Sequence, residues 1–203
     1  MKNRKWFIIL FSLLFIMLCV LIKTNLINNF DNIMYSFITK GMNDTLTTIY
    51  KCITFLGSTG FIILLCVFFL ILFILLKKKN YGIVITVVLI ISTIVNNVLK
   101  IIFARVRPDV LKIVFEDSYS FPSGHTMAAV SMYGILMYLV LKSNINKRIK
   151  IALSIVLSII PVLVAVSRVY LGAHFISDVC GAFLVSIILL LIETYFIDKK
   201  NWI

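Results

Sequence analysis

The chain has 203 residues, of which 62% are hydrophobic and 14% are charged, and its formal net charge is +12. Soluble domains are about 45–50% apolar and about 25% charged, so this composition excludes an ordinary soluble domain and indicates an integral membrane protein. The positive charge alone would suit a nucleic-acid-binding protein. However, the lysines and arginines cluster at the ends of apolar segments, as topology signals do, so we expect no nucleic-acid partner.

Six apolar runs occur along the chain, each near the ~17–25 residues needed to cross a bilayer. The first run follows a short basic start. It is longer than the apolar region of a usual signal peptide, and no Ala-x-Ala-like site follows it, so we expect an uncleaved span. The predicted fold is an all-α, six-helix membrane bundle forming one domain over residues 1–203. The predicted spans are residues 6–22, 61–76, 81–99, 126–141, 151–166 and 175–197.

Residues 23–60 are less apolar and do not resemble a span. Two pieces of this segment carry apolar residues at the i, i+3, i+4 spacing of a helix. These residues are Phe30, Ile33, Met34, Phe37 and Ile38 in the first piece, and Leu46, Ile49, Tyr50 and Ile53 in the second. We predict short amphipathic helices along the extracytoplasmic membrane surface. They would form either a lid packed on the bundle or a rim that guides lipid tails.

The basic segments predict the orientation of the bundle. If six spans alternate, these segments all fall on one side, which the positive-inside rule assigns to the cytoplasm. They comprise Lys2, Arg4, Lys5, residues 77–79, residues 142–150, Lys199 and Lys200. We therefore expect a cell-membrane protein with both termini in the cytoplasm. The many Ile, Asn and Lys residues are typical of an AT-rich bacterial genome. Residues 105–124 and 167–174 then lie on the extracytoplasmic face.

The stretch from Ser167 to Asp178 carries three ionisable groups between two apolar segments. A charge at membrane depth costs a few kcal/mol or more unless it is paired or faces water, so this stretch suggests a site. His174 and Asp178 stand at i and i+4, on one helix face. A carboxylate on one imidazole nitrogen leaves the other free to attack, so we predict that His174 is a nucleophile oriented by Asp178, with Arg168 holding an anion. The alternative is a structural ion pair with Arg168, which would not explain why both histidines share one membrane face.

Lys100 and Arg107 form a second candidate cluster. Seven residues correspond to about two helical turns, which would place both cations on one side of a helix. Pro108 disfavours helical geometry at Arg107, so the helix is expected to end near there. In the alternative interpretation, Lys100 and Arg105 extend to the membrane interface and Arg107 is solvated.

The third cluster is Pro122-Ser123-Gly124-His125, at the start of the fourth span. Ser123 is a plausible N-cap, and the N–H groups of Ser123, Gly124 and His125 are then expected to be unpaired and available to an anion. Gly124 allows a ligand to approach the backbone closely. The alternative is a capped helix start with an interfacial histidine.

Together the three clusters suit phosphoryl transfer. Lys100, Arg107, Arg168 and the amides of residues 123–125 would bind the phosphate oxygens. His174 would attack phosphorus, while His125 would protonate the leaving oxygen and later activate water. Three cations can neutralise the charge that a metal neutralises elsewhere, and no carboxylate cluster is evident, so we expect neither a metal nor another cofactor.

The strings Lys100-x6-Arg107-Pro108, Pro122-Ser123-Gly124-His125 and Ser167-Arg168-x5-His174 resemble the three-part signature of the type 2 phosphatidic acid phosphatase family. This resemblance implies a metal-independent lipid phosphatase whose site lies at the outer membrane surface. It implies that His174 is the nucleophile, that Asp178 supports His174 and that His125 is the acid. It also implies a set of phosphate ligands: Lys100, Arg107, Ser123, Gly124 and Arg168. Within the family, the chain most resembles the bacterial phosphatidylglycerophosphatase B enzymes. The expected substrate is phosphatidylglycerophosphate, with phosphatidate and other lipid phosphates as further candidates.

Three other functions fit parts of the same pattern. An undecaprenyl pyrophosphate phosphatase would use the same phosphate pocket. A lipid phosphotransferase would pass the phosphoryl group to an alcohol, but this short chain has no additional acceptor domain. A transporter or channel is less favoured, because no internal repeat is evident and the charges gather at one face. Membrane lipids are the expected surroundings, and the sequence predicts no particular oligomeric state.

Overall fold

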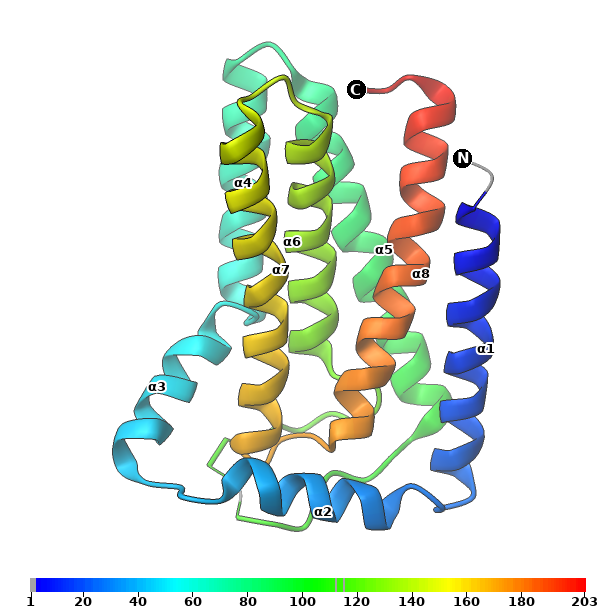
Figure 1. Cartoon of the computed structure of the whole chain (residues 1–203), viewed down its shortest axis with the longest axis vertical. Coiled ribbons are helices and arrows are strands. Elements are labelled where there is room, and N and C mark those ends of the chain that lie inside the picture. Colours follow the sequence, from blue (N-terminus) through cyan, green and yellow to red (C-terminus); the bar gives the residue numbers. More distant parts are fainter. Residues whose placement is uncertain (1–2, 112, 115) are drawn as a thin grey trace.

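The computed structural model describes residues 3–111, 113–114 and 116–203, so Lys2 of the basic start lies outside it. The described residues form helices and connecting loops, with no strand (Figure 1). The helices are α1 (Arg4–Lys23), α2 (Asn28–Thr39), α3 (Asp44–Phe55), α4 (Thr59–Leu75), α5 (Lys79–Phe103), α6 (Gly124–Lys142), α7 (Lys147–Tyr170) and α8 (Ile176–Lys200). The predicted all-α fold is therefore confirmed.

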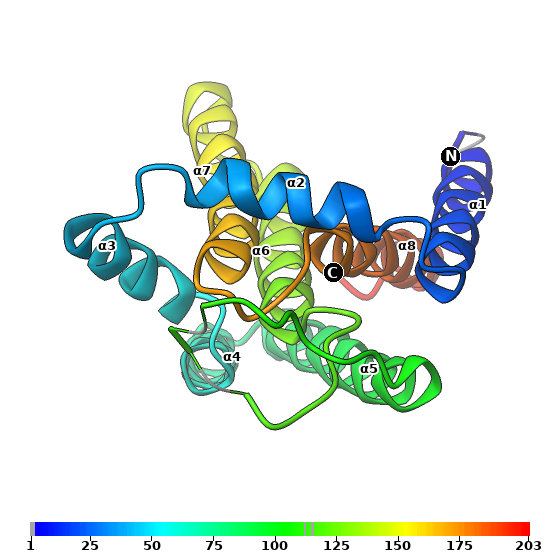
Figure 2. The same ribbon diagram turned by 90° about the horizontal axis from the view of Figure 1, so that it is seen from below.

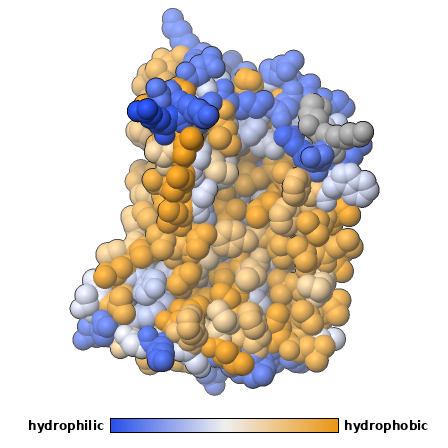
Figure 3. Space-filling model, viewed as in Figure 1, coloured by the Kyte–Doolittle hydropathy of each residue, from blue (hydrophilic) through white to orange (hydrophobic). Residues whose placement is uncertain are grey.

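Each predicted span coincides with a long helix of the bundle. Five helices, α1, α5, α6, α7 and α8, are long and apolar enough to cross a membrane. The α3–α4 pair, bent by 42° at a short break, gives the sixth candidate. Several helices extend beyond the predicted spans, because the polar residues that flank each apolar run are also helical. Figure 3 shows the resulting apolar belt between hydrophilic ends.

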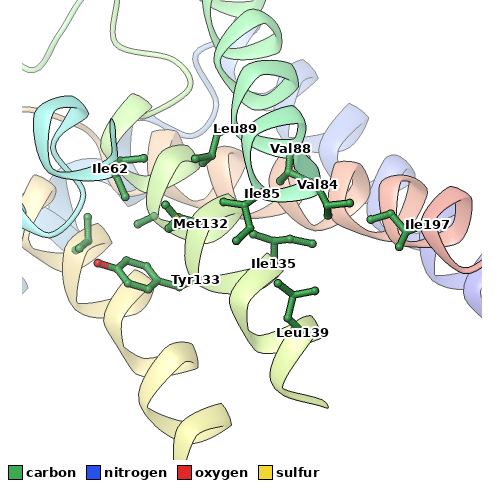
Figure 4. Packing of buried hydrophobic residues seen from close by; sticks show 12 residues of the cluster. Ile62, Val84, Ile85, Val88, Leu89, Met132, Tyr133, Ile135, Leu139 and Ile197 are labelled. Carbon is green, nitrogen blue, oxygen red and sulfur yellow. The ribbon is translucent and has the colours of Figure 1, made fainter. Parts of the chain in front are cut away.

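Helix α6 packs against α5, α7 and α8 and contributes much of the core. Figure 4 shows side chains of its inner face, including Met132 and Ile135, meeting Val84, Ile85 and Val88 of α5. Lipid tails are as apolar as these side chains, so the contacts stabilise the bundle through close packing rather than through removal from water.

The two ends of the bundle are built differently. Both termini lie at one end, where Asp198 of α8 binds Arg4 of α1 at 2.9 Å and Lys142 of α6 at 2.7 Å (Figure 1). The Tyr138 hydroxyl donates to the same carboxylate at 2.7 Å. At the other end, α2 crosses the bundle beside the α7–α8 turn and the connection formed by residues 104–123 (Figure 2).

The predicted helices of the 23–60 segment are present as α2 and α3, but α2 is oriented differently from a simple apolar lid. Its apolar side chains Phe30, Ile33 and Phe37 are exposed, whereas Asp31 is fully buried against the bundle. The apolar face of a helix lying in a membrane interface contacts lipid, which explains this exposure. The contact of α2 with the bundle therefore includes a buried charged group.

Candidate active site

The turn between α7 and α8 places His174 at the end of the bundle where α2 lies. The carbonyl oxygen of Arg168 accepts hydrogen bonds from the N–H groups of Ala173 at 3.1 Å and His174 at 3.3 Å. Gly172 has φ +71°, in the left-handed region that favours glycine. A Cβ on Gly172 would lie 2.5 Å from the carbonyl oxygen of Leu111. The turn is therefore fixed both by its own backbone and by the 104–123 connection packed on it.

His174 is 2% exposed, and Asp178 lies behind it. Its Nδ1 is 3.4 Å from Oδ2 of Asp178 and 3.5 Å from Oγ of Ser120. The same carboxylate accepts hydrogen bonds from the Ser120 hydroxyl and from the N–H of Phe175 at 2.9 Å. A proton on Nδ1 facing this carboxylate leaves Nε2 unprotonated, with its lone pair directed away from Asp178. This nitrogen faces Nη1 of Arg107 at 3.3 Å.

Burial lowers the pKa of His174 to about 4, with a further reduction from Arg168 and Arg107, although Asp178 acts in the opposite direction. The ring is therefore neutral at pH 7, as a nucleophile must be. A buried carboxylate on one side and guanidinium groups on the other orient it without protonating it.

Lys100 and Arg107 converge on one short loop although they come from different elements. Lys100 lies in the last turn of α5, which ends at Phe103, before Arg107 as predicted. The Lys100 ammonium donates to Oγ of Ser118 at 2.8 Å and to the carbonyl of Tyr119 at 2.6 Å. The Arg107 guanidinium donates to the carbonyl of Ser118 at 2.7 Å. Ser118 and Tyr119 thus join the two cations.

Arg168 is 1% exposed and pairs with Glu116, a residue that the sequence interpretation did not include. Its Nη2 lies 2.5 Å from Oε1 of Glu116. The Glu116 carboxylate is also 3.7 Å from Nδ1 of His125 and 4.0 Å from Nη2 of Arg107. Burial would raise the pKa of Glu116, but Arg168 and the neighbouring basic groups outweigh it and lower that pKa. Glu116 is therefore an anion held among three basic residues.

Ser123 caps α6 as predicted, with Oγ accepting a hydrogen bond from the N–H of Thr126 at 3.5 Å. The prediction that the amides of residues 123–125 are all unpaired is wrong for Ser123. Its N–H donates to the carbonyl of Asp178 at 3.3 Å, because the start of α8 packs against the start of α6. A Cβ on Gly124 would lie 3.3 Å from Oδ1 of Asn96, so the backbone is tightly packed here as well.

A cavity of about 520 Å³ brings most of the predicted site residues together. Its polar lining includes Lys100, Arg107, Glu116, Ser118, Gly124, His125 and His174. Ser123, Arg168 and Asp178 lie behind this lining, and Arg168 reaches it through Glu116. The cavity continues between α4 and α5, past side chains that are themselves exposed on the bundle surface: Ile63, Val67, Ile90 and Ile94. It therefore joins a charged chamber to an apolar groove.

The sequence interpretation also did not assign Arg105 or Asp31 to the site. In the alternative interpretation Arg105 extends to the membrane interface, but its guanidinium instead pairs with Asp31 at 2.8 Å and Asp178 at 2.6 Å. The sequence holds one usable signal: Asp31 is the only acidic residue before Asp44, within a segment that has helical apolar spacing. Glu116 offers no such signal, because the loop around it lacks periodicity.

Comparison with known proteins decides the family. The sequence profile of the PAP2 superfamily matches residues 81–202, which contain all three motifs. The chain belongs to the PAP2 superfamily. It is 33% identical over 189 residues to phosphatidylglycerophosphatase B of Bacillus subtilis (strain 168), covering 92% of this chain and 93% of the relative.

Two solved structures resemble the bundle. The transmembrane PAP2-type phosphatidylglycerolphosphate phosphatase of Bacillus subtilis superposes with a TM-score of 0.88 at 32% identity, covering 95% of this chain and 96% of that one. LpxE of Aquifex aeolicus superposes with a TM-score of 0.63 at 25% identity, covering 80% and 93%. The likeness to the Bacillus subtilis phosphatase extends over nearly the whole chain, so it includes α2 and α3.

Proposed function

We propose that the chain is a lipid phosphatase that hydrolyses the terminal phosphate monoester of phosphatidylglycerophosphate. The observation that carries this proposal is the unprotonated Nε2 of a buried, neutral His174 beside Arg107, in a cavity that continues as an apolar groove. A phosphate group fits the charged chamber, and the lipid tail attached to it fits the apolar groove. The similarity to phosphatidylglycerophosphatase B of Bacillus subtilis supports the choice of headgroup.

In the first step, Nε2 of His174 forms a bond to phosphorus and the ester P–O bond breaks. His125 gives a proton to the leaving lipid oxygen, so the alcohol product departs neutral. Asp178 stays ionised beside the Nδ1 proton and stabilises the charge that develops on the ring. The intermediate is a phosphohistidine.

In the second step, His125 accepts a proton from water as the water oxygen attacks phosphorus. The bond between Nε2 and phosphorus breaks and inorganic phosphate is released. Lys100, Arg107 and Arg168 neutralise the charge on the phosphate oxygens through both steps, and the backbone of Gly124 and the capped Ser123 shape the same chamber. Because three fixed cations supply this neutralisation, the reaction needs no metal.

The lipid is taken from the bilayer through the groove between α4 and α5. Its acyl chains lie along the apolar groove residues, and its headgroup reaches the charged chamber at the end of the bundle opposite the termini. The basic segments at the terminal end support a cytoplasmic location of that end. The site therefore acts on the extracytoplasmic leaflet of a bacterial cell membrane.

The replacement His174→Ala tests the nucleophile. We expect phosphate release from phosphatidylglycerophosphate in nanodiscs to disappear, while the protein stays folded and still binds lipid phosphate. Near-normal activity would refute the assignment. A panel with phosphatidylglycerophosphate, phosphatidate and undecaprenyl pyrophosphate tests the substrate, and highest turnover on the pyrophosphate would replace the proposed headgroup. Transfer of phosphate to another lipid without free phosphate would indicate a phosphotransferase.

A further inference from the structure

Asp31 connects the surface helix α2 to the start of α8. Its side chain is 0% exposed, and a buried carboxylate is costly unless it is paired and hydrogen-bonded. Its Oδ1 accepts a hydrogen bond from the N–H of Ser177 at 2.9 Å, and its Oδ2 accepts one from the Ser177 hydroxyl at 2.7 Å. Asp31 thus accepts a hydrogen bond from a backbone N–H in the first turn of α8, a helix that begins 145 residues later in the chain.

Arg105 joins Asp31 to Asp178. One arm of its guanidinium, Nη2, lies 2.8 Å from Oδ2 of Asp31, and the other arm, Nη1, lies 2.6 Å from Oδ1 of Asp178. The guanidinium also stacks over the ring of Phe175 at 4.2 Å from the ring centre. Because the guanidinium is planar and its donors have a fixed fork geometry, it sets the distance between the two carboxylates.

The second oxygen of Asp178 faces Nδ1 of His174 at 3.4 Å. A continuous chain of ion pairs and hydrogen bonds therefore runs from α2 through Arg105 and Asp178 to the imidazole. We propose that Asp31 and Arg105 are positioning residues, which hold Asp178 in the orientation that His174 needs and so couple docking of α2 on the bundle to catalysis. This inference rests on the proposed roles of His174 and Asp178.

If these contacts only stabilised the fold, their removal would leave the titration of His174 unchanged. A positioning role predicts a change, because the network carries charge. Asp31, Arg105 and Asp178 together have one net negative charge beside His174. The ionisable groups around the ring come from five elements of the fold. They are Asp178 from α8, Arg107 and Glu116 from the 104–123 connection, Arg168 from α7, His125 from α6 and Lys100 from α5. None of the variants below alters these six groups, so a change in the titration of His174 reports on the Asp31–Arg105 pair.

The replacement Arg105→Gln leaves two buried carboxylates without their shared cation. The additional negative charge favours protonated His174, so we expect the acid limb of kcat/KM to move to higher pH by about one unit or more. We also expect kcat to fall by up to about 100-fold with little change in KM, because the ring is misplaced while the phosphate cations remain. The replacement Asp31→Asn removes one negative charge, so it should lower kcat without moving the acid limb to higher pH.

The replacement Arg105→Lys separates charge from geometry. A lysine restores the positive charge, but its single ammonium group lacks the fork that reaches both carboxylates. We expect the acid limb to return to the wild-type position while kcat stays low. As a matched control, Asp198→Asn removes a carboxylate that bridges two cations at the opposite end of the bundle. It should lower thermal stability and leave the kcat and the pH profile of the folded protein unchanged.

The measurements are phosphate release from phosphatidylglycerophosphate in nanodiscs between pH 4 and 8, with every rate divided by the fraction of folded protein. Unchanged kcat in Arg105→Gln, Arg105→Lys and Asp31→Asn would overturn the inference. A loss that is equal at every pH in all three variants would also overturn it, since that result indicates a structural role. His174→Ala is assayed in parallel, because activity in that variant would refute the proposed nucleophile rather than the positioning role of Asp31 and Arg105.

Discussion

Glu116 occupies the position among Arg168, Arg107 and His125 where a substrate phosphate is expected. A phosphate must therefore displace this carboxylate from Arg168 before it can bind there. The replacement Glu116→Gln keeps the size of the side chain and removes its charge. We expect the variant to bind inorganic phosphate and orthovanadate more tightly than the wild-type protein does.

The magnitude follows from the Glu116–Arg168 contact. Its two atoms are 2.5 Å apart, Arg168 is 1% exposed and Glu116 is 26% exposed. A hydrogen bond between charged partners contributes about 1.5–3 kcal/mol, and a neutral one about half as much. The two values differ by about 0.75–1.5 kcal/mol, and because the carboxylate is partly solvated we take about 0.5–1 kcal/mol, which corresponds to about 2–5-fold tighter binding.

The assay is inhibition of phosphate release from a lipid substrate by orthovanadate, with the protein in nanodiscs. Inhibitor binding is the better readout, since Glu116 also lies 3.7 Å from His125 and its replacement can alter the chemical step. The exposed neighbour Asp117 offers a matched control, because Asp117→Asn makes the same charge change at the adjacent position. An inhibition constant for Glu116→Gln that equals or exceeds the wild-type value would refute the displacement argument.

Three further predictions test the turn, the titration of His174 and the absence of a metal. The replacement Gly172→Ala should lower the free energy of unfolding by about 1–3 kcal/mol, because φ is +71° and the new Cβ would meet Leu111. Thermal unfolding measures this loss, and an unaltered melting temperature would contradict the prediction. The pKa of His174 falls from 6.5 to about 4 on folding, so the folded state binds fewer protons and stability should decline as pH drops from 6.5 towards 4. The variant His174→Asn should lose less stability over that range in thermal unfolding, and an identical decline would show that other groups dominate. Treatment with EDTA should leave phosphate release unchanged, whereas loss of activity that added Mg²⁺ restores would indicate a metal requirement.

The helices were predictable because apolar runs and basic ends directly reflect the thickness and charge asymmetry of a membrane. The three motifs were recognisable because their residues meet at the ends of spans whose order along the chain is known. The partners of those residues were not predictable in the same way. Arg105 finds Asp31 across 74 positions in the chain, and that pairing depends on how α2 lies against α8.

Two local details also depended on packing. The N–H of Ser123 would be free at an isolated helix start, but the carbonyl of Asp178 reaches it because α6 and α8 begin side by side. Glu116 lies in a loop whose path follows from contacts of Lys100 and Arg107 with Ser118 and Tyr119. Sequence reasoning identified the basic groups of the site but not the acidic residue that they hold.

The side opening of the cavity between α4 and α5 has a consequence for how turnover depends on substrate supply. Lipid that enters there arrives by diffusion within the bilayer plane, so the relevant concentration is the mole fraction of phospholipid substrate in the membrane. Diluting the whole vesicle suspension should leave the rate per enzyme molecule unchanged, whereas adding inert lipid to the same vesicles should reduce it. Kinetic constants for this protein are therefore meaningful per unit of membrane area rather than per unit of volume.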